Sequence, residues 1–170
     1  MEKKDEFILK GKKFKALKFV CHDYDEIKDE IGAEEFSSFS VLRIPYLINE
    51  KKVDNPNVIV INHKELHIIL GYPLRKTIVK TFEKLISGFS REDVLWCIYR
   101  AYKEIYAEEE GKILTHDFHH YITSKSYDIN NILKNKGKHG IWGHIINDLF
   151  VEGIEKVIYK PNYIYIVVGS

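Results

Sequence analysis

The longest helical pattern in the chain follows Ser90. Apolar residues recur every three or four positions from Val94 to Ile105, which is typical of one buried side of a helix. Ser90 and Asp93 have the Ser-x-x-Asp spacing of a helix N-terminus with its capping side chain. The acidic run 108–110, followed by Gly111, would close the helix. Because acids oppose the negative end of the helix dipole, we expect this end either to fray or to find a basic partner.

The rest of the pattern predicts shorter elements joined by turn-forming residues. Alternation and β-rich composition predict strands over 15–21, 40–48, 58–61, 154–159 and 163–168, while residues 65–70 fit either a strand or a short helix. Three-to-four periodicity predicts helices over 23–32, 74–87 and 141–150, with short ones over 115–121 and 126–133. The turns at 49–57 and 160–162 predict two hairpins. Pro45 suggests an edge strand or a bulge, and Gly88 a helix C-cap.

These elements indicate an α+β fold. Residues 1–87 form an N-terminal part of short strands plus helices, and residues 88–170 form a helical part that ends in a β-hairpin. Helices followed by a two-stranded wing are typical of a winged-helix domain, so the second part is predicted to be winged-helix-like, with 141–150 as its recognition helix. A boundary near Gly88 would separate the two parts, unless they pack as one compact domain.

Composition narrows the function classes. The chain has 170 residues, of which 45% are hydrophobic, enough for a real core. No apolar run approaches the ~18 residues of a membrane span, and the charged start lacks a signal-peptide pattern. We therefore expect an intracellular protein, cytoplasmic or nuclear, without a membrane partner. Cys21 and Cys97 are too few for a disulfide scaffold and are expected to be buried thiols. A net charge of +1 disfavours unselective binding to polyanions.

Histidines suggest a metal site as one alternative. His116 and His120 have the i, i+4 spacing that places two zinc ligands on one helix face, and Asp117 or His144 could complete the set. Zinc or another divalent metal would then support a metal-dependent hydrolase. The competing interpretation is an exposed histidine-rich turn with no cofactor. No Gly-rich phosphate loop and no Gly-x-Ser-x-Gly motif occurs in the sequence, so catalysis is not the favoured class.

A second metal interpretation follows the order of His-Asn-His nucleases. His119 and His120 would supply the general base, Asn130 or Asn131 the middle residue, and His139 the metal ligand. Those nucleases place the first histidine on a hairpin, whereas residues 115–121 have a helical pattern.

Nucleic-acid binding is the other alternative. Lys134, Lys136, Lys138 and His139 form a basic loop that could contact phosphates. The helix expected over 141–150 carries no Arg and has acids on its outward side, which argues against base readout. The simpler interpretation of the loop is a solvated, charged surface.

Aromatic residues favour a third function. The chain contains 11 tyrosines and two tryptophans, and such residues are enriched at the centres of interfaces. Trp142, Trp96 and Tyr99 are the candidate anchors, although they could equally cover the junction between the two parts. The favoured function is a non-catalytic protein-interaction or self-assembly module that binds a protein partner or a second copy.

Several stretches resemble parts of uncharacterised proteins of large DNA viruses. They are Gly140-Ile-Trp-Gly-His-Ile-Ile-Asn-Asp-Leu-Phe-Val-Glu-Gly-Ile154, Phe89-Ser-Arg-Glu-Asp-Val94 and the helix through Ala107. The resemblance covers the second half of the chain, and the heavy use of Lys, Ile, Asn and Tyr fits an AT-rich genome. It implies a viral source and a role in the virion or the host cell, with no catalytic residue to assign.

Overall fold

The computed structural model describes residues 14–17, 38–86, 88–109, 122–124, 139–141 and 144–170. The strands are β1 (Phe14–Ala16), β2 (Phe39–Ser40), β3 (Ile59–Ile61), β4 (Glu65–Leu70), β5 (Ile78–Lys84), β6 (Phe89–Ser90), β7 (Ile122–Ser124), β8 (Phe150–Val157) and β9 (Tyr163–Gly169). The helices are η1 (Val41–Arg43), α2 (Ile44–Asn49), α3 (Arg91–Glu109) and η2 (Ile146–Asp148). The fold is α+β, as the sequence predicts.

Seven of the described strands form one mixed sheet. Its order is β1-β8-β9-β4-β5-β7, and β2 pairs with β8 as well. β8 and β9 form the predicted C-terminal hairpin, which begins at Phe150 and is therefore longer than expected. β9 runs parallel to β4, so this hairpin completes the centre of the sheet. Strands from both sides of Gly88 share the sheet, and the division of the chain at this residue stays a prediction.

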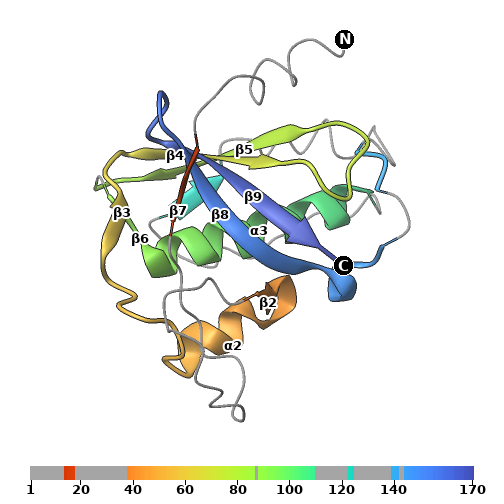
Figure 1. Ribbon diagram of the computed structural model, residues 1–170, viewed down its shortest axis with the longest axis horizontal. Helices are drawn as coiled ribbons and strands as arrows, with labels where there is room; N and C mark the ends of the chain where they lie inside the picture. The colour runs from red at the N-terminus through yellow and green to blue at the C-terminus, as the bar shows by residue number, and fades with distance from the viewer. Residues whose placement is uncertain (1–13, 18–37, 87, 110–121, 125–138, 142–143) are drawn as a thin grey trace.

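α3 packs behind the sheet, where β8 and β9 pass in front of it (Figure 1). Its N-terminus has the predicted cap. The Asp93 backbone N–H donates to Ser90 Oγ at 3.2 Å, and the Ser90 N–H donates to the Asp93 carboxylate at 2.9 Å. Every residue of α3 is buried or half-buried, and its apolar side chains join the core formed with the inward residues of the sheet. No helix in the described part of the chain is long and apolar enough to cross a membrane.

The prediction of a helix over 74–87 is wrong. Residues 78–84 form β5, which pairs with β4 along its whole length, and Gly88 (φ +105°) precedes β6 and caps no helix. Alternation was hidden in the sequence because two of the residues that point toward α3 are Lys80 and Lys84. Both form ion pairs with acids of α3, so the inward positions of this strand do not look apolar.

The prediction of a strand over 40–48 is also wrong. β2 is followed by the short helices η1 and α2, and Pro45 lies in the first turn of α2, where its missing N–H costs nothing. The hairpin expected across 49–57 does not form, because β3 pairs with β6. Residues 65–70, which the sequence left open, form the strand β4.

The helix predicted over 141–150 is absent from the residues that are described there. They contain only η2 before β8 begins. A winged-helix arrangement, which needs a recognition helix at this place, is therefore not supported. The helices predicted over 23–32, 115–121 and 126–133 lie outside the described residues, as does most of the strand predicted over 15–21.

Candidate functional site

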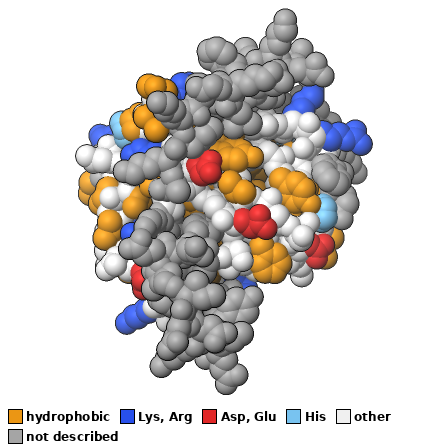
Figure 2. All heavy atoms as spheres, viewed as in Figure 1, with side chains coloured by type: hydrophobic (Ala, Val, Ile, Leu, Met, Phe, Trp, Pro, Cys, Tyr) orange, Lys and Arg blue, Asp and Glu red, His pale blue; other side chains and the backbone are white. Residues whose placement is uncertain are grey.

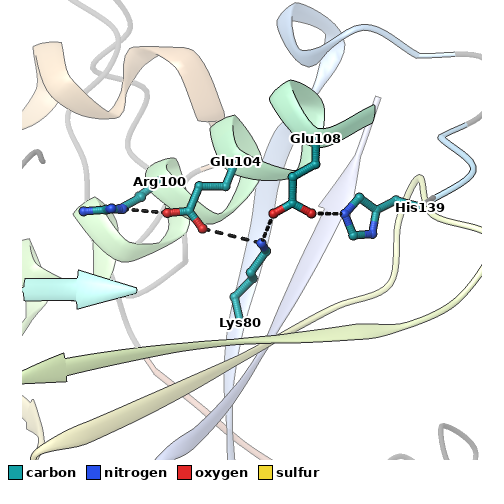
Figure 3. Close-up of polar contacts among 5 residues, drawn as sticks. All are labelled: Lys80, Arg100, Glu104, Glu108 and His139. Atoms are coloured by element: carbon teal, nitrogen blue, oxygen red, sulfur yellow. Dashed lines mark hydrogen bonds and ion pairs between the residues drawn. The ribbon is translucent and has the colours of Figure 1, made fainter. Parts of the chain in front are cut away.

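Charged side chains are buried between β5 and α3. Lys80 is 3% exposed, and Glu104 and Glu108 are each 1% exposed. The Lys80 Nζ lies 2.7 Å from Glu108 Oε1 and 3.5 Å from Glu104 Oε2. Arg100 Nε donates to the other oxygen of Glu104 at 2.7 Å. Figure 3 shows Lys80 reaching from the strand toward Glu104 and Glu108, with Arg100 on the other side of Glu104.

His139 extends this group from a separate segment of the chain. Its Nε2 lies 2.5 Å from Glu108 Oε2. The adjacent Glu109 carboxylate accepts the backbone N–H groups of His139 at 2.9 Å and of Ile141 at 3.1 Å. Of the two expectations for the acidic end of α3, a basic partner is observed for Glu108, which pairs with Lys80 and contacts His139. We call Lys80, Arg100, Glu104, Glu108 and His139 the ionic network.

The ionic network holds elements together and offers no reactive group to solvent. The formal charges of Lys80 and Arg100 match those of the two carboxylates, Glu104 and Glu108. Both oxygens of Glu104 and both of Glu108 contact a network partner. A buried charge that lost its partner would be strongly destabilising, so the network joins β5, α3 and residues 139–141 in one arrangement.

A second, partly buried ion pair lies nearer the start of α3. Lys84 Nζ is 2.6 Å from Asp93 Oδ2 and donates to the Gly88 carbonyl at 2.9 Å. Cys97 follows on the same helix and is 1% exposed. Burial raises the pKa of the Cys97 thiol well above its ordinary value, and the nearby Asp93 carboxylate raises it further. Because the thiolate is the nucleophile, Cys97 is not a candidate reactive residue.

His144, the third residue of the proposed zinc set, belongs to a tyrosine cluster. The Tyr72 hydroxyl lies 2.6 Å from His144 Nε2 and 2.9 Å from Ser170 Oγ. The Tyr106 hydroxyl donates to the His144 carbonyl at 3.0 Å. Burial raises the pKa of Tyr106 to about 12, with a smaller contribution from Asp148. These bonds fix the segment before η2 against α3 and the turn after β4.

Most of the other residues predicted to bind a metal or phosphates lie outside the described part of the chain. His116 and His120 lie outside the described residues, as do Asp117, His119, Asn130 and Asn131. Within the described part of the chain no group of three or more His, Cys, Asp or Glu could hold a metal ion. Lys134, Lys136 and Lys138 also lie outside it. His139 is described, and only 8% of it is exposed because it packs against Glu108.

Two of the three candidate aromatic anchors, Trp96 and Tyr99, lie in the described part of the chain. Trp96 and Tyr99 are half-buried on α3, with ring centroids 6.0 Å apart in an edge-to-face contact. Tyr99 packs against the core, and burial raises the pKa of its hydroxyl. Trp142 lies outside the described residues. The interface role of these three residues stays a prediction.

A more exposed apolar surface lies at one end of the large sheet. The residues after β5, those before β4 and the turn between β8 and β9 emerge there together, as the hydrogen bonds Lys84 N to Lys64 O (2.9 Å) and His67 N to Asn162 O (2.8 Å) show. β3 and the residue before it adjoin this end, as the hydrogen bond from Gly88 N to His63 O (3.0 Å) shows, and they bring two more residues. We call the exposed apolar residues of this end the strand-end patch: Val58, Ile59, Leu85, Ile86, Ile158 and Tyr159.

Figures 1 and 2 allow this end to be followed by eye. In Figure 1, β3, β6 and the dark-blue turn between β8 and β9 lie at the left. At the left of Figure 2, hydrophobic side chains lie beside Lys or Arg and His side chains. His63, Lys64 and Lys160 are exposed residues of this end. The patch therefore combines apolar and basic side chains.

The sequence analysis predicted neither the ionic network nor the strand-end patch. Arg100, Glu104 and Glu108 recur every four residues, and this spacing on one side of α3 was the available signal for the ionic network. Leu85 and Ile86 fall within the helix predicted over 74–87, which does not form, so the periodicity did not mark them as surface residues. Comparisons of the chain with protein-family models, with curated proteins and with solved structures give no match. The resemblance to proteins of large DNA viruses therefore stays a prediction.

Proposed function

We propose that this protein is a non-catalytic interaction module whose binding surface is the strand-end patch. The observation that carries the proposal is the exposure of Leu85 (83%), Ile86 (79%) and Tyr159 (70%) at one end of the sheet. Removing a large apolar side chain from water contributes about 1.5–3 kcal/mol. Large contiguous apolar patches on soluble proteins commonly mark interaction sites.

The buried charges support the non-catalytic part of the proposal. The carboxylates of the ionic network are occupied by partners within the protein, and Cys97 is buried with a raised thiol pKa. These groups are well placed to stabilise the fold and poorly placed to meet a substrate. The resemblance of residues 140–154 to proteins of large DNA viruses supports an infected cell or a virion as the setting.

A matched pair of variants tests the proposal. Leu85→Ser/Ile86→Ser removes the two most exposed residues of the patch. Ile145→Ser removes an equally large residue, 62% exposed, which precedes η2 at the opposite end of β8. Both variants should keep the thermal stability of the wild type, since exposed positions contribute within about 0.5 kcal/mol.

The variants are then used to capture partners from lysates of the source or infected cells after nuclease treatment. We expect a protein retained by the wild type and by Ile145→Ser to be lost from the double variant. Equal retention by all three would reject the patch as the binding surface. Partners that disappear on nuclease treatment alone would favour the nucleic-acid alternative.

A further inference from the structure

We infer that the strand-end patch binds a second copy of this chain, forming a two-fold symmetric dimer. The inference rests on the proposed function, because it names the partner of the same surface. Three observations carry it: the size of the patch, the presence of both charge signs at its border, and the net charge of the chain.

The size of the patch suits a dimer interface. Leu85, Ile86 and Tyr159 are 83%, 79% and 70% exposed, and Ile59, Val58 and Ile158 are 52%, 47% and 46% exposed. With roughly 200 Å² as an upper bound for each fully exposed side chain, these fractions amount to no more than about 750 Å². One partner of a standard interface contributes about 800 Å². The apolar residues alone therefore come close to the area that a stable pair requires.

Charges of both signs border the patch. Lys64, directly before β4, and Lys160, in the turn between β8 and β9, are exposed. Glu65 and Glu83 are paired across β4 and β5, next to Lys64 and Lys84. The Glu65 carboxylate lies 3.5 Å from His67 Nε2 within the same copy, and 39% of the Glu65 side chain is exposed. A two-fold axis brings the same patch of both copies together, so the lysines of one copy can lie over the carboxylates of the other.

The same charges disfavour other occupants. An anionic lipid surface or a nucleic acid would meet Glu65 and Glu83, and a strongly basic segment would meet Lys64 and Lys160. A second copy presents both lysines and carboxylates, so each charge can face a charge of the opposite sign. The net charge of +1 adds little repulsion between copies, and a net charge near zero favours association.

Sedimentation equilibrium of the full chain over the micromolar range tests the inference. We expect a monomer–dimer equilibrium that Ile145→Ser leaves unchanged. Leu85→Ser/Ile86→Ser should raise the dimer dissociation constant at least about tenfold, the ratio that corresponds to 1.4 kcal/mol. A wild type that stays monomeric, or a dimer that the double variant does not weaken, would overturn the inference.

Complementary charge reversal tests the symmetry. Lys64→Glu/Lys160→Glu and Glu65→Lys/Glu83→Lys should each be monomeric where the wild type is dimeric. Their equimolar mixture should form a heterodimer, provided that each variant retains the wild-type circular dichroism spectrum. If that condition fails for the glutamates, Glu65→Lys alone replaces the second variant. A mixture that stays monomeric, or a wild type that grows beyond the dimer, contradicts a two-fold interface.

The capture experiment separates the two levels of failure. A monomeric wild type whose captured partner is lost from Leu85→Ser/Ile86→Ser would overturn the dimer and leave the interaction module standing. A monomeric wild type whose captured proteins are unaffected by the double variant would overturn both.

Discussion

Replacing Lys80 by Met should destabilise the protein more than any change of an exposed lysine. Met is similar in length and tolerated in a core, so the substitution removes the charge while keeping most of the packing. Glu108 would then keep only His139 among its network partners, and Glu104 only Arg100. Both carboxylates would remain buried, each 1% exposed.

The structure sets the size of the effect. Breaking one partner out of a buried ion pair costs about 3–5 kcal/mol. Because each carboxylate here retains a second basic neighbour, we expect the lower end, about 3 kcal/mol. For a chain of this length each kcal/mol lowers the melting temperature by about 2–4 °C, so the expected decrease is roughly 6–12 °C.

Urea and thermal unfolding followed by circular dichroism measure the change. Lys103→Met, which alters a half-buried lysine of α3 outside the ionic network, is the control and should cost less than about 0.5 kcal/mol. Lys80→Met/Glu108→Gln should cost less than the sum of the two single variants, since neighbours in one network are not additive. A loss below about 1 kcal/mol for Lys80→Met would refute the view that the network stabilises the contact between β5 and α3.

Three further results are expected. Gly140→Ala should lower the free energy of unfolding by about 1–2 kcal/mol, because Gly140 has φ +60° and an added Cβ would lie 2.6 Å from the Arg75 side chain; a stability equal to the wild type in urea would contradict this. Cys97 should stay unmodified by a thiol reagent in the native protein and react fully in denaturant, which peptide mapping by mass spectrometry can follow; rapid native labelling would show that the thiol is accessible. The pKa of Tyr106 is raised from 10 to about 12, so folding favours its neutral form, and stability present below pH 10 should be lost as the pH rises toward 12. Tyr106→Phe, which lacks the titrating group, should lose less stability over this range, and an unchanged slope would argue against the assignment.

The parts of the fold that could be predicted are those whose signal lies within one segment. α3 carries its cap, from Ser90 to Asp93, and its apolar stripe in consecutive residues. The C-terminal hairpin carries two alternating runs around the turn at 160–162. Neither needs information from elsewhere in the chain, and both are present.

The parts that failed depend on distant partners. The sequence of β5 predicts a helix because Lys80 and Lys84 occupy inward positions and hide the alternation of a strand. These inward lysines are favourable only because acids of α3 pair with them. The apolar residues after position 141 have helical spacing, yet β8 begins at Phe150 because β9 and β2 pair with it. The strand-end patch was missed for the same reason. In a helix over 74–87, Leu85 would face inward, whereas after β5 it is exposed.

The parallel contact between β4 and β9 bears on how the chain acquires its structure during synthesis. β4 and β5 leave the ribosome before α3 and β8, and all of these elements must emerge before β9 can pair with β4. Until then the central strand of the sheet has one open edge and part of the core face of α3 is uncovered. The nascent chain should therefore need protection from aggregation until β9 emerges, and ribosome profiling of bound chaperones would detect that interval.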